Sequence, residues 1–204
     1  MYNKAIKRVM IYPISLLALG ASAGLVHKCS GYRLAAVLFL RGRIMSINLI
    51  TDNSWSDILK IQEEAYLEIE PEDVDILKSK WLLSPNTCAV YKEGDTISAY
   101  LLAHPWPSEI PPKLHEISHV TASLNLYLHD LALAKESRGK GIAKKLVTNL
   151  VGIAKAQGFN KILLVAVQNS SGFWGTFGFK NQPDAVICPS YGHNAKLMIL
   201  KLKA

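Results

Sequence analysis

Residues 127–143 read Tyr-Leu-His-Asp-Leu-Ala-Leu-Ala-Lys-Glu-Ser-Arg-Gly-Lys-Gly-Ile-Ala, and this stretch decides the fold. It predicts a strand over 124–134, a short glycine-bearing loop, and a helix over 141–157. Apolar residues recur at helical spacing along one face of that helix, at Ile142, Leu146, Leu150 and Ile153. An unbroken apolar run over 161–167 then predicts a central strand that is buried on both faces. A strand, a helix and a second strand in such close succession imply a parallel crossover.

The loop at 138–143 has the chemistry of a phosphate cradle. Gly139 and Gly141 let the backbone approach a ligand closely, and the free amides and dipole at a helix start favour anions. Further positive charge comes from the side chains of Lys140, Lys144 and Lys145. A glycine-bearing turn with no ligand is the alternative interpretation. Two common phosphate motifs are excluded, because Gly141 stands where a Walker loop needs Ser or Thr, and Lys144 where a dinucleotide fingerprint needs Gly or Ala.

The rest of the chain adds strands and helices on both sides of this unit. Strands are predicted over 46–51, 87–91, 96–103 and 195–202, and helices over 54–68, 71–81 and 172–177. The fold class is therefore α/β with a mixed sheet. Four prolines within 104–119 predict a long, stiff loop. We expect a solvated connection between the first two helices from its run of acids, which are Glu68, Glu70, Glu72, Asp73 and Asp75.

Charge is distributed unevenly along the chain, and this excludes a nucleic-acid partner. The formal net charge of +7 comes from residues 1–44, which hold seven basic residues and no acidic one. From Met45 onward 16 basic and 16 acidic residues cancel, so the body has no net attraction for DNA or RNA. Three scattered cysteines form neither a disulfide framework nor a metal-spaced set. We therefore expect a reducing, cytoplasmic location and no metal.

The chain divides at Met45 into a basic, apolar leader (1–44) and a body (45–204). Residues 9–26 are uncharged and mostly apolar, basic residues precede them, and Ala21-Ser22-Ala23 resembles a cleavage site. Three interpretations stay open: a non-native upstream extension, a membrane contact or anchor through 9–26, and an export signal. Pro13, Gly20 and Gly24 weaken a helix there.

Three motifs of the body resemble those of the GNAT superfamily of acyl-CoA-dependent N-acetyltransferases. Arg138, Gly141 and Ala143 fill the fixed positions of the family's pyrophosphate loop, Arg/Gln-x-x-Gly-x-Gly/Ala. Residues 127–133 resemble the strand that precedes this loop, and 169–179 resemble the family's closing segment of Asn, a short helix and Gly-Phe. The motifs occur in the family's order, and the likeness is sharp only over 127–180.

The resemblance implies a mixed, splayed central sheet of about six to seven strands flanked by helices. It implies acetyl-CoA as cosubstrate, with its pantetheine arm in the gap between the diverging strands. Backbone groups of Leu131, Ala132 and Leu133 would pair with that arm, one of them as an oxyanion-hole donor. The cradle for the pyrophosphate would comprise Arg138, Gly139, Lys140, Gly141, Ile142, Ala143 and Lys144. Asn169 would contact the cofactor beyond the next strand.

Two residues of the strand are candidates for catalysis. His129 occupies the place where some family members carry a glutamate base that acts through water, and an imidazole suits neutral pH. Strand alternation predicts that His129 shares a face with Tyr127 and Leu131, and Asp130 with Leu128 and Ala132. A purely structural role is the alternative for both. Trp174 stands where the family often has an acidic tyrosine, and an indole is no acid, so we expect packing.

The sequence therefore predicts transfer of an acetyl group from acetyl-CoA to a primary amine by direct attack in a ternary complex. A small-molecule amine is the expected acceptor, although its identity is not encoded in any motif. A non-catalytic acyl-CoA-binding sensor and a protein or peptide N-acetyltransferase remain as alternatives. The oligomeric state also stays open, with a homodimer as one arrangement.

Overall fold

The computed structural model describes residues 45–66, 69–119 and 122–202 of the 204-residue chain. The leader at 1–44, with its apolar stretch at 9–26, lies outside the described residues. Within the described ranges, no helix has both the length and the apolar character needed to cross a bilayer.

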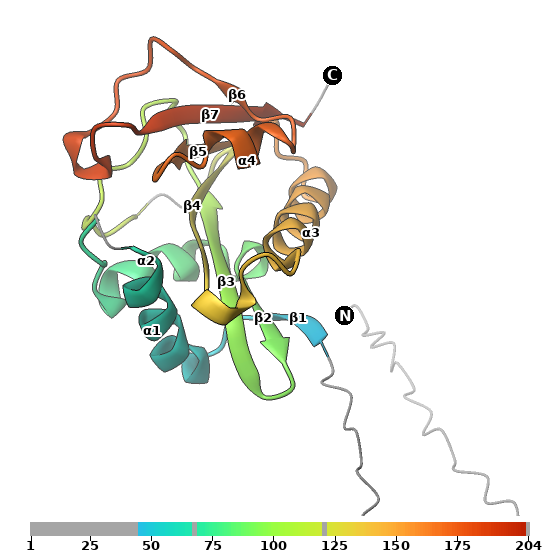
Figure 1. Cartoon of the computed structure of the whole chain (residues 1–204). Coiled ribbons are helices and arrows are strands. Elements are labelled where there is room, and N and C mark those ends of the chain that lie inside the picture. The colour runs from blue at the N-terminus through green and yellow to red at the C-terminus, as the bar shows by residue number, and fades with distance from the viewer. Residues whose placement is uncertain (1–44, 67–68, 120–121, 203–204) are drawn as a thin grey trace, which may run out of the picture. The chain divides into compact units, whose positions relative to one another are not determined.

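A seven-stranded mixed sheet forms the centre of the body, with the spatial order β1-β2-β3-β4-β5-β7-β6 (Figure 1). The strands are β1 (Met45–Leu49), β2 (Ala89–Glu93), β3 (Thr96–Pro105), β4 (Asn125–Leu133), β5 (Lys161–Ala166), β6 (Lys180–Asn181) and β7 (Lys196–Lys201). Neighbouring strands are antiparallel except β4 and β5, which are parallel and joined by a helix. The predicted α/β class, the mixed sheet and the parallel crossover are confirmed.

The parallel pair at the centre of the sheet separates soon after it forms. β4 and β5 pair only through Asn125–Lys161, Leu126–Ile162 and Tyr127–Leu163, although both strands continue beyond these residues. Their carboxyl-terminal halves therefore diverge and leave a gap in the middle of the sheet. This is the splayed sheet that the sequence predicted.

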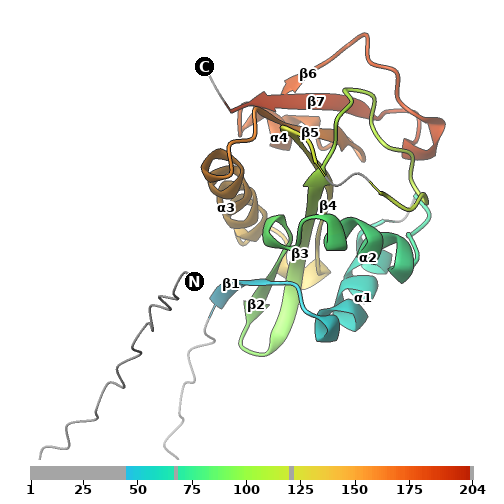
Figure 2. The same ribbon diagram turned by 180° about the vertical axis from the view of Figure 1, so that it is seen from behind.

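Helices cover both faces of the sheet (Figures 1 and 2). They are α1 (Trp55–Ala65), α2 (Val74–Leu83), α3 (Ile142–Ala156) and α4 (Ser171–Gly175), with short 3-10 turns at Asp52–Ser54, Pro85–Thr87, Lys135–Ser137 and Pro189–Tyr191. One apolar core includes Trp55, Ile58 and Leu77 beneath α1 and α2. The other joins Leu146 and Leu150 of α3 to Trp174 of α4 across the opposite face. The gap between β4 and β5 thus lies between two firmly packed layers.

The element boundaries differ from the sequence prediction at a few positions. The helix predicted over 54–68 begins at Trp55. Ser54 makes no cap hydrogen bond to α1, and its hydroxyl accepts instead from the Thr51 amide at 3.1 Å. β3 continues through His104 to Pro105, which shortens the predicted proline-rich loop. The two-residue strand β6 was not predicted, because two residues carry no readable periodicity.

Candidate active site

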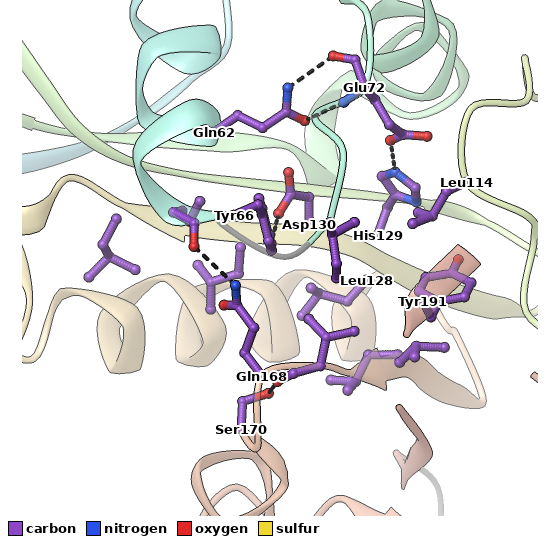
Figure 3. Close-up of a pocket in the computed structure, with 18 of the residues that line it drawn as sticks. Gln62, Tyr66, Glu72, Leu114, Leu128, His129, Asp130, Gln168, Ser170 and Tyr191 are labelled. Atoms are coloured by element: carbon purple, nitrogen blue, oxygen red, sulfur yellow. Dashed lines mark hydrogen bonds and ion pairs between the residues drawn. The ribbon is translucent and has the colours of Figure 1, made fainter. Parts of the chain in front are cut away.

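A cavity of about 330 Å³ occupies the gap between β4 and β5 (Figure 3). The end of α1 and the segment that follows it form one wall, and the start of α3 and residues 167–174 form the other. The predicted site residues that line this cavity are His129, Asp130, Leu131, Ala132, Leu133, Arg138 and Ala143. The splay therefore creates the site, since without it the strands would pair where the cavity now lies.

The glycine loop at the start of α3 has the geometry of an anion cradle. Gly139 and Gly141 adopt φ values of 78° and 75°, which only glycine adopts at low cost. Open space lies beyond both, with no atom within 4 Å of where a Cβ would stand. Gly141 caps α3 without any side-chain hydrogen bond, so the first-turn amides remain available to a ligand.

The other predicted cradle residues contribute unequally. The Arg138 guanidinium donates to the Glu64 carbonyl at 3.2 Å, which fixes it at the cavity wall. Lys144 is exposed, whereas the Ile142 side chain is buried in the core and offers only its backbone. The Lys140 ammonium lies 3.9 Å from the Glu93 carboxylate. Asn169 is exposed and does not line the cavity.

Two neighbours of Asn169 line the cavity in its place. Gln168, with φ of 50°, donates to the Ala65 carbonyl at 3.3 Å and so bridges the two walls. Ser170 lines the same wall, and its hydroxyl donates to the Val167 carbonyl at 2.7 Å.

A β-bulge aims the two candidate catalytic side chains. Leu102 pairs with Asp130 and Ala103 pairs with Leu128, so His129 is an extra residue in β4. The bulge interrupts the alternation that the sequence analysis assumed. Leu131 packs with the α3 core, whereas the side chains of His129 and Asp130 both reach groups on the α1–α2 side (Figure 3). The prediction that His129 shares a face with Leu131, and not with Asp130, is therefore wrong.

Glu72 is the centre of a buried polar cluster above β4. One carboxylate oxygen lies 2.5 Å from Nε2 of His129. The other accepts from the Lys80 ammonium at 2.9 Å and from the His115 amide at 2.7 Å. The side chains of Glu72, Lys80 and His129 are only 5%, 1% and 2% exposed. Burial alone would raise the pKa of Glu72, but His129 and Lys80 hold it well below its usual range.

A side chain of α1 fixes the backbone of Glu72. The Gln62 amide donates to the Glu72 carbonyl at 2.9 Å and accepts from the Glu72 amide at 3.3 Å. These two bonds reproduce the pairing of neighbouring strands and hold the segment before α2 against α1 (Figure 3). The prediction of a solvated acidic connection is therefore wrong for Glu72, which is 6% exposed.

His129 is oriented by Glu72 and retains one free nitrogen. An ionised carboxylate only accepts hydrogen bonds, so Nε2 of His129 carries the hydrogen between them. In its neutral form the ring holds a bare lone pair on Nδ1, and this buried nitrogen has no hydrogen-bond partner among the described residues. The rings of His104 and Tyr127 pack against His129, with centroids 5.9 Å and 6.0 Å away. An imidazole held in this way is a positioned base.

His104 stays neutral beneath His129. Burial and the neighbouring His129 lower its pKa to about 3. Its Nδ1 lies 3.0 Å from the Pro105 carbonyl and donates to it. His104 therefore packs against the ring of His129 and adds no positive charge next to it.

Asp130 has a different environment from His129. Its two carboxylate oxygens accept from the hydroxyls of Tyr66 and Tyr100, one each. Burial raises the pKa of Asp130, and the two donors act in the opposite direction. The same burial, together with the Asp130 charge, raises the pKa of both tyrosines well above the usual value. With both oxygens occupied, Asp130 is suited to hold structure rather than to accept a proton.

Trp174 packs as the sequence analysis predicted. Its side chain is 7% exposed, and its ring contacts Phe173, Phe177 and Phe179. The indole N–H donates to the Ser170 hydroxyl at 3.2 Å. Trp174 therefore forms part of the cavity wall and supplies no acid.

The sequence analysis missed most of the polar cluster. Tyr66, Tyr100 and Gln62 carried no motif, and Glu72 was grouped with its acidic neighbours. Lys80 alone gave a readable signal, because it lies three residues after Leu77 on the buried face of α2. A charge on an apolar helical stripe predicts a buried partner, and here that partner is Glu72.

A splayed strand pair with a glycine loop opening the next helix defines the class of acyl-CoA-dependent acyltransferases. The model of the acetyltransferase (GNAT) family matches residues 55–179, more than half of the chain. The chain belongs to this family. No curated protein sequence matches it significantly.

Solved structures share the fold at low sequence identity. The GphF GNAT-like decarboxylase in complex with isobutyryl-CoA is 13% identical, with a TM-score of 0.67 over 78% of this chain and 100% of that one. The loading GNATL domain of CurA from Lyngbya majuscula is 13% identical, with a TM-score of 0.65 over 78% and 98%. The NatC complex bound to Gag peptide and CoA is 20% identical, with a TM-score of 0.60 over 78% and 99%.

Proposed function

We propose that the protein transfers the acetyl group of acetyl-CoA to a primary amine by direct attack in a ternary complex. Membership of the acetyltransferase family supports the acyl-CoA donor. The observation that carries the rest is His129, which lines the cavity between β4 and β5 and whose Nδ1 has no hydrogen-bond partner among the described residues. A base is needed there because an amine with a pKa near 10 is mostly protonated at pH 7 and cannot attack.

The residues of the glycine loop fit the donor. The open space at Gly139 and Gly141 and the uncapped first turn of α3 suit a pyrophosphate, with Arg138 close by. β4 has no β5 partner along Leu131–Leu133, which suits the amide-bearing arm that must lie in the gap. One of these amides would donate to the thioester oxygen as negative charge develops there.

His129 then has a defined task. Its Nδ1 takes one proton from the amine, directly or through one water, and Glu72 stabilises the imidazolium that results. The amine nitrogen forms a bond to the carbonyl carbon, and the carbon–sulfur bond breaks. The nitrogen then gives its second proton, through water, to the departing CoA thiolate, which leaves as the thiol. A thiol with a pKa near 8.5 leaves without a strong acid. This agrees with Trp174 in the cavity wall and with Tyr191, whose hydroxyl proton is already donated to the Pro112 carbonyl.

The experiment that tests this proposal is a thiol-release screen with acetyl-CoA. Amines, free amino acids, polyamines, aminoglycosides and short peptides are offered in parallel, and product mass is measured for each. We expect CoA release that depends on an acceptor and is lost in His129→Ala. A protein that binds acetyl-CoA but releases no CoA with any acceptor is a sensor, and that result would reject the proposal.

We propose a small-molecule acceptor and a cytoplasmic location, where the acyl donor is made. Leu114 lines the cavity on the acceptor side, and the cavity volume of about 330 Å³ favours a compact acceptor. The solved NatC structure, which holds a peptide, keeps a peptide acceptor as the second candidate. Peptides are therefore included in the screen, and faster turnover of peptides than of every small amine would decide for that alternative.

A further inference from the structure

The acceptor side of the cavity has an unequal distribution of charge. Three acids line it, which are Glu70, Glu72 and Asp130. Among the described lining residues the one arginine or lysine is Arg138, and it lies on the glycine-loop side and is bonded to Glu64. Lys80 is charged but lies behind Glu72, 1% exposed, with its ammonium on that carboxylate. No described cation therefore faces the acceptor.

Within the described chain, the two unpartnered polar groups on the acceptor side are both hydrogen-bond acceptors. Nδ1 of His129 belongs to a side chain that is 98% buried (2% exposed) and lines the cavity without a partner among the described residues. Glu70 is exposed at the cavity wall and makes no hydrogen bond or ion pair with the described part of the chain. The orphaned nitrogen and the acid are both acceptors, so the complementary ligand group is a donor with positive charge.

The remaining surface of the acceptor side is apolar. Ile69, Pro71, Leu114 and the ring of Tyr191 line it. A group next to the amine would contact these side chains, and a carboxylate there would lie close to Glu70, which has no cation partner among the described residues. Like charges at such distances disfavour each other and cost affinity.

We propose that the acceptor is a primary ammonium on an apolar body with no carboxylate beside it, and that Glu70 selects for this charge. Free α-amino acids are excluded, whereas amines and α-amino amides are accepted. The inference rests on the proposed transferase function and adds the substrate class. Glu70 acts by its charge at the cavity wall and takes no part in the proton transfer.

The test compares three acceptors that share one side chain. L-leucine, L-leucinamide and isopentylamine are each assayed for CoA release with saturating acetyl-CoA, and alanine and phenylalanine series are run alongside. Leucinamide removes the carboxylate charge but also lowers the amine pKa. Isopentylamine removes the carboxylate and keeps an amine pKa near 10, so it separates charge exclusion from amine basicity.

We expect kcat/KM for leucinamide and for isopentylamine to exceed that for leucine by at least about tenfold, a typical cost of one misplaced charge. Glu70→Lys should narrow this gap at least about fivefold, mostly through KM, because it supplies the missing cation. Asp52→Lys is the matched control, since Asp52 is exposed at the other end of α1, roughly 16 Å away along the helix. Asp52→Lys should leave the difference in kcat/KM between leucine and the other two acceptors unchanged.

The possible outcomes separate the two proposals. If leucine is turned over as fast as leucinamide or isopentylamine, the acceptor assignment is wrong and the transferase function still holds. The same conclusion follows if Glu70→Lys leaves the difference in kcat/KM unchanged. Absence of CoA release with every member of all three series, from protein that binds acetyl-CoA, would overturn the transferase function itself.

Discussion

The two walls of the cavity are built by different means. The wall proposed for the cofactor depends on backbone: the half of β4 that β5 does not pair, the open first turn of α3, and beside them two glycines with positive φ. The acceptor wall is made of buried side chains that hold one another, with Glu72 joining His129 to Lys80. A wall of backbone tolerates changes in side chains but not in backbone conformation. A wall of coupled charges should respond in the opposite way, and each prediction below tests this contrast.

The largest expected effect is on the free energy of unfolding, through the buried charges of the acceptor wall. Glu72→Gln leaves Lys80 buried without a charged partner, and breaking a buried pair costs about 3–5 kcal/mol of unfolding free energy. Urea unfolding at pH 7 measures this loss. The double variant Glu72→Gln/Lys80→Met removes both charges, so it should be more stable than the single variant. A double variant that is no more stable would show that the pair is uncoupled.

The same variant has a predicted pH dependence. The pKa of folded Glu72 lies below its ordinary value of 4.5, so the stabilisation by its charge is complete above about pH 4.5. It is lost as the pH falls below that value. The stability gap between the wild type and Glu72→Gln should therefore close in acid. A gap that stays constant from pH 7 to pH 3 would contradict the ionised state of Glu72.

The next effect separates catalysis from cofactor binding. His129→Ala should lower kcat at least about a hundredfold, because a positioned base contributes about 10²- to 10⁴-fold. It should leave acetyl-CoA affinity near normal and remove the ascending limb of the rate profile against pH. His129→Gln keeps a hydrogen bond to Glu72 but cannot take the proton, so it should be nearly as poor. Retention of most activity and of the pH profile by both variants would make His129 a structural residue.

A backbone change should act only on the cofactor wall. Gly141→Val places a branched residue at φ of 75°, where L-residues are strained, and so disturbs the amides at the start of α3. We expect acetyl-CoA affinity to fall at least about tenfold by calorimetry, a cost of about 1.4 kcal/mol. Gly152→Ala, within α3 and facing open space, is the control and should retain affinity. Unchanged affinity in a folded Gly141→Val protein would refute the cradle.

The smallest effect is expected where a side chain only fills space. Trp174→Phe should reduce kcat by less than about tenfold, because Trp174 packs against three phenylalanines and supplies no proton. Steady-state kinetics on protein with unchanged melting behaviour measures it. A loss near a thousandfold would instead give the indole a direct role at the leaving thiolate.

The same contrast explains what the sequence could predict. Arg138, Gly139 and Gly141 are neighbours in the chain, and local chemistry alone identifies them as an anion loop. Glu72 and His129 are 57 residues apart, and no local pattern links them. The bulge at His129 was also hidden, since one extra residue in a strand leaves the apolar pattern almost unchanged while it redirects a side chain. Local motifs are therefore readable, and contacts between distant side chains are not.

The divergence of β4 from β5 affects how the folded chain binds an extended molecule. Beyond Tyr127, β4 is an interior sheet edge, because β5 no longer pairs with it there. Ordinary edges pair readily with other chains, but this one lies in a cavity that is also lined by the end of α1 and by residues 167–174. A molecule with suitably spaced amides completes the sheet as an eighth strand would. Occupancy should therefore raise the melting temperature even for a ligand that carries no acyl group to transfer.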